Sequence, residues 1–197
     1  LDEALVDLSL EVLGGMGLAV LLLCEDPATG LPHYYTTAHG EEHPGTTSWL
    51  TPNGRTNEPW PGGAPGLRPQ VLRVGVVVDS PREPELNSVV AEAFGERVAH
   101  HGLHSPSYDC HVVELFAPHV SKWAGLEEVA RIQGIDPRSV IAIGDDSNDI
   151  SMLQGASLSF AMGTAHPRVA QHAKRMTASQ AECGVAQVVE GVLEGRW

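Results

Sequence analysis

The pattern of apolar and polar positions is clearest near residue 140. Residues 140–143, Val-Ile-Ala-Ile, run without alternation, which is typical of a parallel strand covered on both faces. Gly144 ends the run, and the acidic, turn-forming residues 145–149 follow. Residues 150–154 predict a short helix that stops at Gly155. Because ligands of open α/β sheets collect beyond the carboxyl ends of the strands, this acidic loop is the first candidate site.

The preceding part of the chain predicts a small module rich in strands. A turn at 26–30 joins the first two strands into a hairpin. Residues 40–69 are rich in Pro and Gly and predict a long loop, with a short helix near 48–50. We therefore expect residues 1–116 to form one α+β domain. The expected strands are 18–24, 33–37, 71–78, 97–100 and 110–115, and the expected helices are 1–15 and 83–94.

After Pro118 the pattern alternates between helix and strand, which is typical of βαβ units. We expect residues 117–197 to form part of a parallel-sheet α/β core. Ser121 and Gly134 are the expected caps of the first helix. A capping box at 179–182 predicts the start of the last helix, whose apolar residues share one face. The expected elements are helix 121–133, strand 157–161, helix 167–174, edge strand 175–177 and a final helix with Val185, Val188, Val189, Val192 and Leu193 on its apolar face.

Composition narrows the classes of function. Of 197 residues, 42% are apolar, so a packed core is expected, and the net charge of −13 argues against nucleic-acid or anionic-membrane partners. The three cysteines, Cys24, Cys110 and Cys183, have no metal-site spacing and no disulfide framework. A reducing, cytoplasmic location is the natural expectation. The apolar run 18–24 is too short to span a bilayer.

The acidic loop allows two interpretations on residue types alone. Clustered carboxylates repel each other unless a cation lies between them, and Mg²⁺ is the divalent ion that best suits this kind of site. Alternatively, the loop only caps the helix at Ile150, as Asp and Asn commonly do. Lys122, at the start of a helix, could neutralise a phosphate or the Asp145 cluster, or it could be an ordinary solvated lysine.

Four segments together resemble the haloacid dehalogenase superfamily and, more narrowly, its Cof-type phosphatases. The resemblance covers about residues 112–197, while residues 1–111 are similar to the α/β cap of that family only in strand order. At the third segment the chain has Thr164 where the family has Asn, and at the fourth it has Cys183 where an acidic residue is usual. The segments are 118–122 (Pro-His-Val-Ser-Lys), 144–149 (Gly-Asp-Asp-Ser-Asn-Asp), 161–165 (Ala-Met-Gly-Thr-Ala) and 183–185 (Cys-Gly-Val).

The resemblance implies a role for each matching residue. Lys122 would bind the substrate phosphate and act in catalysis, and Asn148 would also contact the phosphate. Asp145 would be the ligand of Mg²⁺. Asp149 would act in catalysis by orienting Lys122 or metal-bound water. Asp146 would be a helix cap or a weak contributor, and Thr164 would support the site.

One part of the family pattern is absent. The family's nucleophile is the first Asp of an Asp-x-Asp-Gly-Thr motif on the first core strand, and this chain contains no such motif. We expect the nucleophile upstream of Leu1, in a longer protein, and we expect this chain alone to be inactive. The aromatic residues Trp49 and Trp60 could line a substrate pocket or simply fill the module's core. No set of histidines has zinc-site spacing.

The sequence thus predicts the cap and the carboxyl-terminal half of the core of an Mg²⁺-dependent phosphatase. Its substrate would be a small phosphorylated metabolite, for example a sugar phosphate, hydrolysed through an aspartyl-phosphate. The alternative from another class is a non-catalytic protein that binds a phosphorylated ligand or a protein partner. A phosphomutase or a sucrose-phosphate-type phosphatase is the alternative among the enzymes. Oligomeric state is open.

Overall fold

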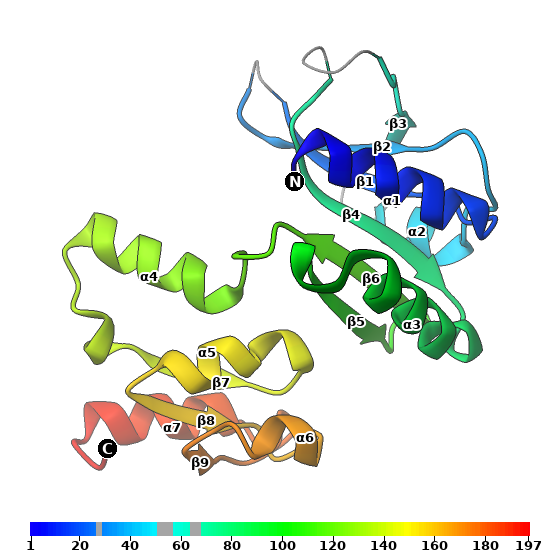
Figure 1. The fold of residues 1–197 in the computed structure, drawn as a ribbon. Coiled ribbons are helices and arrows are strands. Elements are labelled where there is room, and N and C mark those ends of the chain that lie inside the picture. The colour runs from blue at the N-terminus through cyan, green and yellow to red at the C-terminus, as the bar shows by residue number, and fades with distance from the viewer. Residues whose placement is uncertain (27–28, 51–56, 64–67) are drawn as a thin grey trace. The chain divides into compact units, whose positions relative to one another are not determined.

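The computed structural model describes residues 1–26, 29–50, 57–63 and 68–197, which form two compact units, Leu1–His119 and Val120–Trp197 (Figure 1). Part of the predicted hairpin turn (27–28) and parts of the predicted long loop (51–56 and 64–67) lie outside the described residues. None of the helices in the described ranges has the length and apolar content that a membrane span requires.

A six-stranded sheet is the framework of unit 1. Its order is β3-β2-β1-β4-β6-β5, and all neighbours are antiparallel except β2 and β3. The two strongest strand predictions, 71–78 and 110–115, are confirmed at the centre of the sheet, as is the β1–β2 hairpin. The strands are β1 (Leu21–Glu25), β2 (Pro32–Thr36), β3 (Asn57–Pro59), β4 (Val71–Val78), β5 (Ala99–Ser105) and β6 (Cys110–Phe116).

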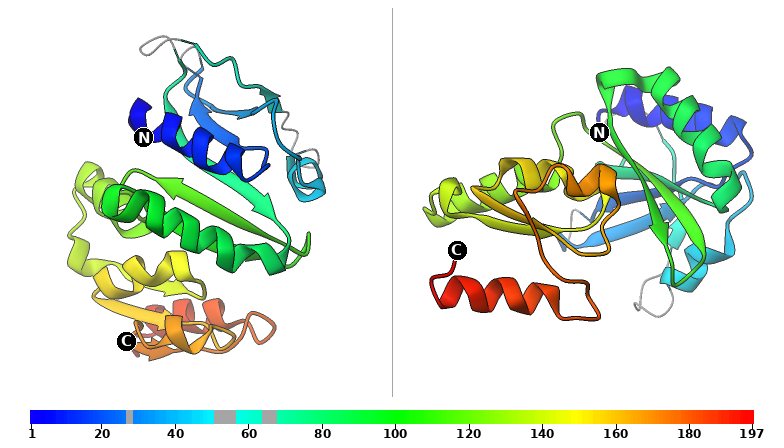
Figure 2. Two further views of the ribbon diagram at one scale, coloured as in Figure 1. Left: turned by 45° about the vertical axis from the view of Figure 1, so that its right-hand side comes forward. Right: turned by 90° about the horizontal axis from the view of Figure 1, so that it is seen from below.

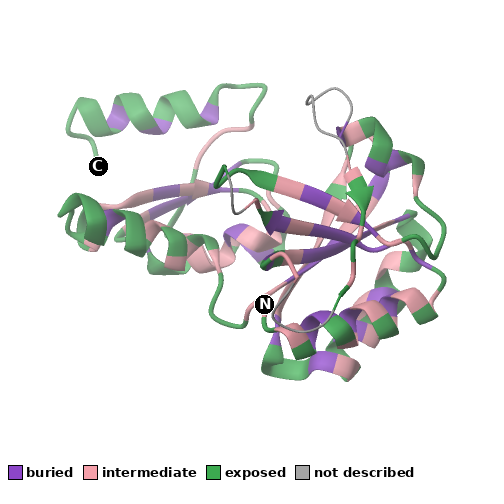
Figure 3. Cartoon of the chain, turned by 90° about the horizontal axis from the view of Figure 1, so that it is seen from above, coloured by how far each residue is buried: buried purple, intermediate pink, exposed green. Residues whose placement is uncertain are grey.

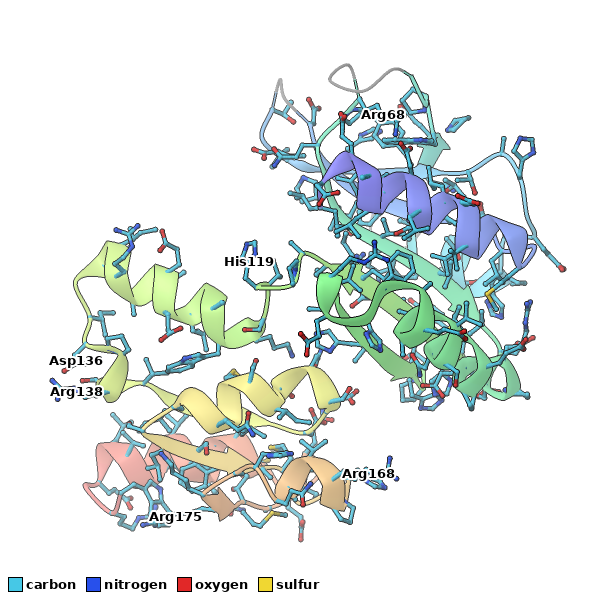
Figure 4. The ribbon with its side chains drawn as sticks, in the orientation of Figure 1. Arg68, His119, Asp136, Arg138, Arg168 and Arg175 are labelled. Carbon is cyan, nitrogen blue, oxygen red and sulfur yellow. The ribbon has the colours of Figure 1, made fainter. Side chains whose placement is uncertain are left out.

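The helices of unit 1 cover the two faces of this sheet unequally. Helices α1 (Glu3–Gly15) and α3 (Glu83–Phe94) lie on one face, where Leu13, Phe94 and Val76 share a fully enclosed core (Figure 2). An ion pair between Arg68 and Asp7 of α1 lies at the edge of this layer (Figure 4). On the other face, the short helix α2 (Pro44–Leu50) packs through Leu50 on Leu21 and Tyr34 of the sheet.

Unit 2 is built around three short parallel strands in the order β7-β8-β9. Helix α5 packs on β7 and β8 and against α4. Helix α7 lies on the opposite side of this sheet from α5 (Figure 2, right). The elements are α4 (Lys122–Gln133), β7 (Ile141–Gly144), α5 (Ile150–Gly155), β8 (Leu158–Ala161), α6 (Pro167–Ala170), β9 (Arg175–Met176) and α7 (Gly184–Leu193).

Both predicted caps of α4 are confirmed. The Ser121 hydroxyl accepts a hydrogen bond from the Ala124 N–H at 3.1 Å. Gly134 ends the helix in the left-handed region, with φ 66°. A 3-10 turn at Pro137–Ser139 then leads into β7, and the exposed pair Asp136–Arg138 marks this turn (Figure 4).

Several predicted boundaries in unit 1 are wrong. The long loop holds helix α2, which begins at Pro44 rather than near 48, and strand β3. Pro tolerates the first turn of a helix, so the composition of this segment hid the element. Strand β5 begins later and extends further than predicted, because Arg97 belongs to a 3-10 turn and pairing with β6 holds the His-rich run to Ser105.

Two predictions near the carboxyl end also need correction. Helix α6 ends at Ala170, four residues early, in a series of turns. Ser179 and Glu182 do bond each other, but both the hydroxyl and the N–H of Ser179 donate to Glu182 Oε2. Helix α7 starts only after Cys183, which has a positive φ of 59° and makes no side-chain capping bond.

Helix α7 is amphipathic as predicted, but most of its apolar face is open in the described residues. Val188 is buried, whereas Val189 is 49% and Leu193 82% exposed (Figure 3). Trp197 folds back over Gly191 and meets Phe160 of β8 with ring centroids 5.5 Å apart. The contact of α7 with the rest of unit 2 is therefore carried by a few residues.

Candidate functional site

The candidate site lies at the carboxyl end of β7. Gly144 closes the strand, a 3-10 turn at Ser147–Asp149 follows, and α5 continues from it. The turn that carries Thr164 lies beside this loop, because the Met162 N–H donates to the Gly144 carbonyl at 2.9 Å. The strand-end position inferred from the apolar pattern is thus where the structure gathers the polar side chains.

Asp149 is the central side chain of the loop. It folds back toward the strand, and its Oδ2 accepts hydrogen bonds from the N–H groups of Asp145 (2.9 Å) and Asp146 (3.2 Å). Only glycine fits beneath it, because a Cβ at Gly144 would lie 2.5 Å from the Asp149 Cβ. Gly144 therefore serves the close approach of a buried carboxylate as well as ending the strand.

Lys122 reaches this carboxylate from the start of α4. Its ammonium donates to Asp149 Oδ1 at 2.5 Å and to Asn148 Oδ1 at 3.1 Å. Lys122 is 47% exposed, but it is not an unpartnered surface lysine, because both of these side chains accept hydrogen bonds from it. An ammonium has three N–H donors, and two are used here, so one remains for a ligand. Since the Asn148 oxygen accepts from Lys122, its amide N–H₂ group is left to donate elsewhere.

Opposing effects act on the pKa of Asp149. Burial raises it, since a carboxylate loses hydration in the interior. The hydrogen bond from Lys122 and those from the backbone of Asp145 and Asp146 lower it, and together they outweigh burial. The pKa of Asp149 is thus below its ordinary value. The side chain is an anion that holds Lys122 in place as a cation.

The carboxylates of Asp146 and Asp145, the other two in the loop, differ from Asp149 in their hydrogen bonds. Asp146 caps the 3-10 turn, with its Oδ1 accepting from the Ser147 N–H at 2.6 Å. The capping interpretation therefore holds for Asp146, but Asp149 makes no capping bond to α5. Asp145 is exposed, and among the described residues its carboxylate has no hydrogen-bond partner. Its oxygens are open to a cation or to water.

Sequence reasoning missed two features of the site. The Ser147 hydroxyl is buried and has no hydrogen-bond partner in the described structure. A buried hydroxyl without a partner is costly, so it marks a place for a water or a ligand oxygen. The second feature is Trp123, next to Lys122, whose indole lies on Gly155 of α5. Neither the burial of the Ser147 hydroxyl nor the contact of Trp123 with Gly155 can be inferred from the neighbouring residues in the sequence.

The fit of Mg²⁺ to these residues rests on Asp145. It offers hard carboxylate oxygens near donors suited to phosphate, which is the setting in which Mg²⁺ is usually held by one or two carboxylates, waters and a substrate phosphate. No group of three or more His, Cys, Asp or Glu that could hold a metal occurs within the described ranges. The residues therefore fit Mg²⁺ as one protein ligand of an incomplete set.

The architecture is shared with solved structures of haloacid dehalogenase-like hydrolases. A haloacid dehalogenase-like hydrolase from Bacillus subtilis matches 96% of this chain and 70% of its own chain, with a TM-score of 0.72 and 17% identity. A haloacid dehalogenase-like hydrolase from Bacteroides thetaiotaomicron matches 96% of this chain and 65% of its own, with a TM-score of 0.64 and 22% identity. These likenesses define the fold as haloacid dehalogenase-like.

A comparison of the amino-acid sequence with known protein families identifies the family of this chain. The family described as haloacid dehalogenase-like hydrolase matches residues 70–189, more than half of the chain. The chain belongs to this family, which confirms the resemblance seen in its motifs.

Curated relatives are similar over part of their length. A B. subtilis protein named 5-amino-6-(5-phospho-D-ribitylamino)uracil phosphatase YitU is 32% identical over 107 residues, 54% of this chain and 38% of the relative. The Escherichia coli phosphatase YbjI, of the same stated activity, is 34% identical over 111 residues, 56% of this chain and 39% of the relative. The matched region thus spans about two-fifths of these relatives.

Proposed function

We propose that the protein to which this chain belongs hydrolyses small phosphate monoesters with Mg²⁺, and that residues 120–197 supply part of its phosphate site. The observation that carries this proposal is the joint position of Lys122, Asn148 and Asp145 around the end of β7. Two relatives named as phosphatases of a phosphorylated ribitylamino-uracil support a small phosphorylated metabolite as substrate.

Each side chain has a defined task in this proposal. The remaining N–H of Lys122 and the amide N–H₂ of Asn148 bind phosphoryl oxygens, and the Ser147 hydroxyl gives a further donor. Asp149 holds the Lys122 ammonium in position through their ion pair. Asp145 would hold Mg²⁺, which when bound neutralises charge on the phosphoryl group. Fixed donors of this kind stabilise the charge of a transferring phosphoryl group without reorganisation.

The chemical step needs a nucleophile in addition to Lys122, Asn148 and Asp145. We propose an aspartate carboxylate, whose oxygen forms a bond to phosphorus while the bond from phosphorus to the leaving oxygen breaks. The leaving oxygen takes a proton and departs as an alcohol. Water then attacks the phosphorus, the bond from phosphorus to the aspartate oxygen breaks, and inorganic phosphate leaves as the carboxylate is regenerated. Lys122 and Asn148 serve both steps, since the same phosphoryl oxygens carry charge in each.

A binding-only protein is the alternative. It would use the same donors to hold a phosphorylated ligand and would release no phosphate. Its distinguishing feature is the absence of any in-line carboxylate.

The test is phosphate release from a panel of phosphate monoesters by the full-length protein, with Mg²⁺ and with EDTA. We expect Mg²⁺-dependent turnover that Lys122→Met lowers by about 100-fold or more, since a donor at the transferring charge contributes roughly 3–4 kcal/mol. Lys174→Met is the matched control, because Lys174 bonds the carbonyls of Ala156 and Ser157 and has no contact with the site loop. Turnover that survives in Lys122→Met would contradict the assignment, and retained phosphate-ester binding without turnover in the wild type would favour the binder.

A further inference from the structure

The two edges of the unit 1 sheet differ in how they are protected against pairing with another strand. Strand β3 ends one edge, and its three residues include Glu58 and Pro59, which both oppose the addition of a further strand. Strand β5 ends the other edge (Figure 1). Its seven residues, Ala99–Ser105, include no Pro, Lys or acidic residue, none of them is fully buried, and they pair with β6 without a bulge. Among the described residues, the β5 edge therefore lacks the protection that the β3 edge has.

Alternate residues of β5 direct their backbone groups away from β6. The turn at 106–109 closes on the pair Ser105–Cys110, so Ser105 and every second residue before it bond to β6. The residues between them are His100, Gly102 and His104, and their N–H and C=O groups point to the outer side of the strand. The edge thus offers these three residues to a further antiparallel strand.

The β5 strand is complementary to a second copy of itself. Gly102 is its middle residue, with three residues on each side. Two antiparallel β5 strands related by a twofold axis at Gly102 therefore match over their full length, and the two glycines leave the axis free of side chains. In this register His100 of one copy lies opposite His104 of the other. Each pair of outward-facing residues exchanges two N–H···O bonds.

The charges near β5 also suit this pairing. A Cβ at Gly102 would lie 2.6 Å from Glu83 Oε1 of α3, so every second side chain of β5, including His100 and His104, lies on the α3 face. Across the twofold axis the Glu83 carboxylate is then diagonal to histidines rather than to acidic side chains of β5. The chain has 25 acidic residues and a net charge of −13, and none of the acidic residues lies in β5. Two copies that meet at this edge therefore keep most of their negative charge apart.

We propose that the protein forms a dimer in which β5 pairs with β5 of a second copy, antiparallel and centred on Gly102. This interaction surface is independent of the proposed phosphatase activity, because the residues of β5 do not belong to the phosphate site. An extended segment of another protein would use the same backbone groups, but it would not require the match of His100 with His104 that a second copy provides.

The experiment is analytical ultracentrifugation of the full-length protein at pH 8 over a range of micromolar concentrations. We expect a reversible monomer–dimer equilibrium in the wild type. The variant His100→Lys with His104→Lys places like charges opposite each other on both sides of the axis, and it should raise the dissociation constant at least about tenfold. The variant His100→Lys with His104→Glu places opposite charges there instead, and its dissociation constant should stay within about threefold of the wild-type value or fall below it.

The matched control is Glu58→Lys at the other edge of the same sheet. It changes the net charge by the same amount as the double-lysine variant, since a Glu and two neutral His are replaced respectively, and it should leave the dimer unchanged. Urea unfolding checks that each variant folds. If the double-lysine variant does not fold, His100→Glu with His104→Glu takes its place, because it also sets like charges opposite each other.

Three results would overturn the proposal. The first is a wild type that stays monomeric over the whole concentration range, which would leave the edge to a different chain or to none. The second is a dimer that folded like-charge variants do not weaken, since the contact would then lie elsewhere. The third is a His100→Lys, His104→Glu variant that dimerises as weakly as the like-charge variant, which would exclude the register centred on Gly102. None of these results depends on phosphate release, so the proposed phosphatase activity is tested separately.

Discussion

The contact between Trp123 and Gly155 gives a prediction about how Lys122 is held. A Cβ at Gly155 would lie 2.2 Å from Trp123 Cδ2 and 2.3 Å from Cε2. Carbon atoms rest about 3.5 Å apart, so Gly155→Ala forces the indole to move by roughly 1.3 Å. Trp123 is the neighbour of Lys122 in the first turn of α4, and its N–H also approaches Ser151 Oγ of α5 at 3.5 Å. Displacing the indole therefore displaces the ammonium.

The magnitude follows from two opposing effects. Overpacking costs about 1–3 kcal/mol, while alanine in place of glycine gains at most about 1 kcal/mol, and less at a helix end such as Gly155. We expect the free energy of urea unfolding to fall by about 1–2 kcal/mol. Displacement of a catalytic group by about 1 Å can cost on the order of 100-fold, so kcat for phosphate release should fall by about 10- to 100-fold.

Two further variants isolate the cause. Gly125→Ala is the matched control, because a Cβ there meets nothing within 4 Å, and it should leave kcat unchanged. Trp123→Ala combined with Gly155→Ala removes the clash and should recover part of the lost kcat. Equal stability and kcat in Gly155→Ala and the wild type would contradict the proposed coupling of Trp123 to Lys122, as would a double variant no better than Gly155→Ala.

Other predictions follow from single sites. Burial raises the pKa of Cys24 to about 11 and also raises the pKa of Cys110, so both remain thiols at pH 8. Alkylation of the folded protein, followed residue by residue, should therefore modify the exposed Cys183 first. Equal labelling of all three cysteines would contradict this expected order. Asp149→Asn removes a buried anion whose partner Lys122 is 47% exposed, so solvent screening limits the expected cost to about 1–2 kcal/mol in urea unfolding, whereas an unchanged midpoint would show that the pair contributes little. Ser121→Ala loses the cap of α4 and should cost about 1 kcal/mol in the same assay, with no loss counting against the cap.

The sequence predicted well those elements whose signal is local. The apolar run 71–78 gave β4 at its observed bounds, and Ser121 with Gly134 marked both ends of α4, because strand burial and helix caps depend on neighbouring residues. Helix α2 was largely missed, since its first residues are Pro, Gly and Thr and its stability comes from Leu50 and its neighbours packing on the sheet. Pattern reasoning has no access to such tertiary stabilisation.

In the candidate site, too, residues with a local sequence signal could be predicted, whereas contacts between distant residues could not. Its motif residues could be named because they are close in sequence or match a family pattern, and the position of Lys122 at a helix start left its role open until the family resemblance was added. The bond from Lys122 to Asp149 joins residues 27 positions apart, and the contact of Trp123 with Gly155 is equally long-range. The partnerless Ser147 hydroxyl is a property of packing alone. The roles of these residues in catalysis remain predictions.

We propose that Asp145 is the metal-binding carboxylate, and its neighbour Asp146 offers a matched comparison. Asp145→Asn and Asp146→Asn change the same group one residue apart, and asparagine retains the capping ability that Asp146 needs. The decisive measurement is the Mg²⁺-dependent rate of phosphate release by the two full-length variants. We predict a loss of about 100-fold or more in Asp145→Asn, by the same electrostatic argument as for Lys122, and a rate within about threefold of wild type in Asp146→Asn. Equal rates in both variants, or a larger loss in Asp146→Asn, would contradict the assignment.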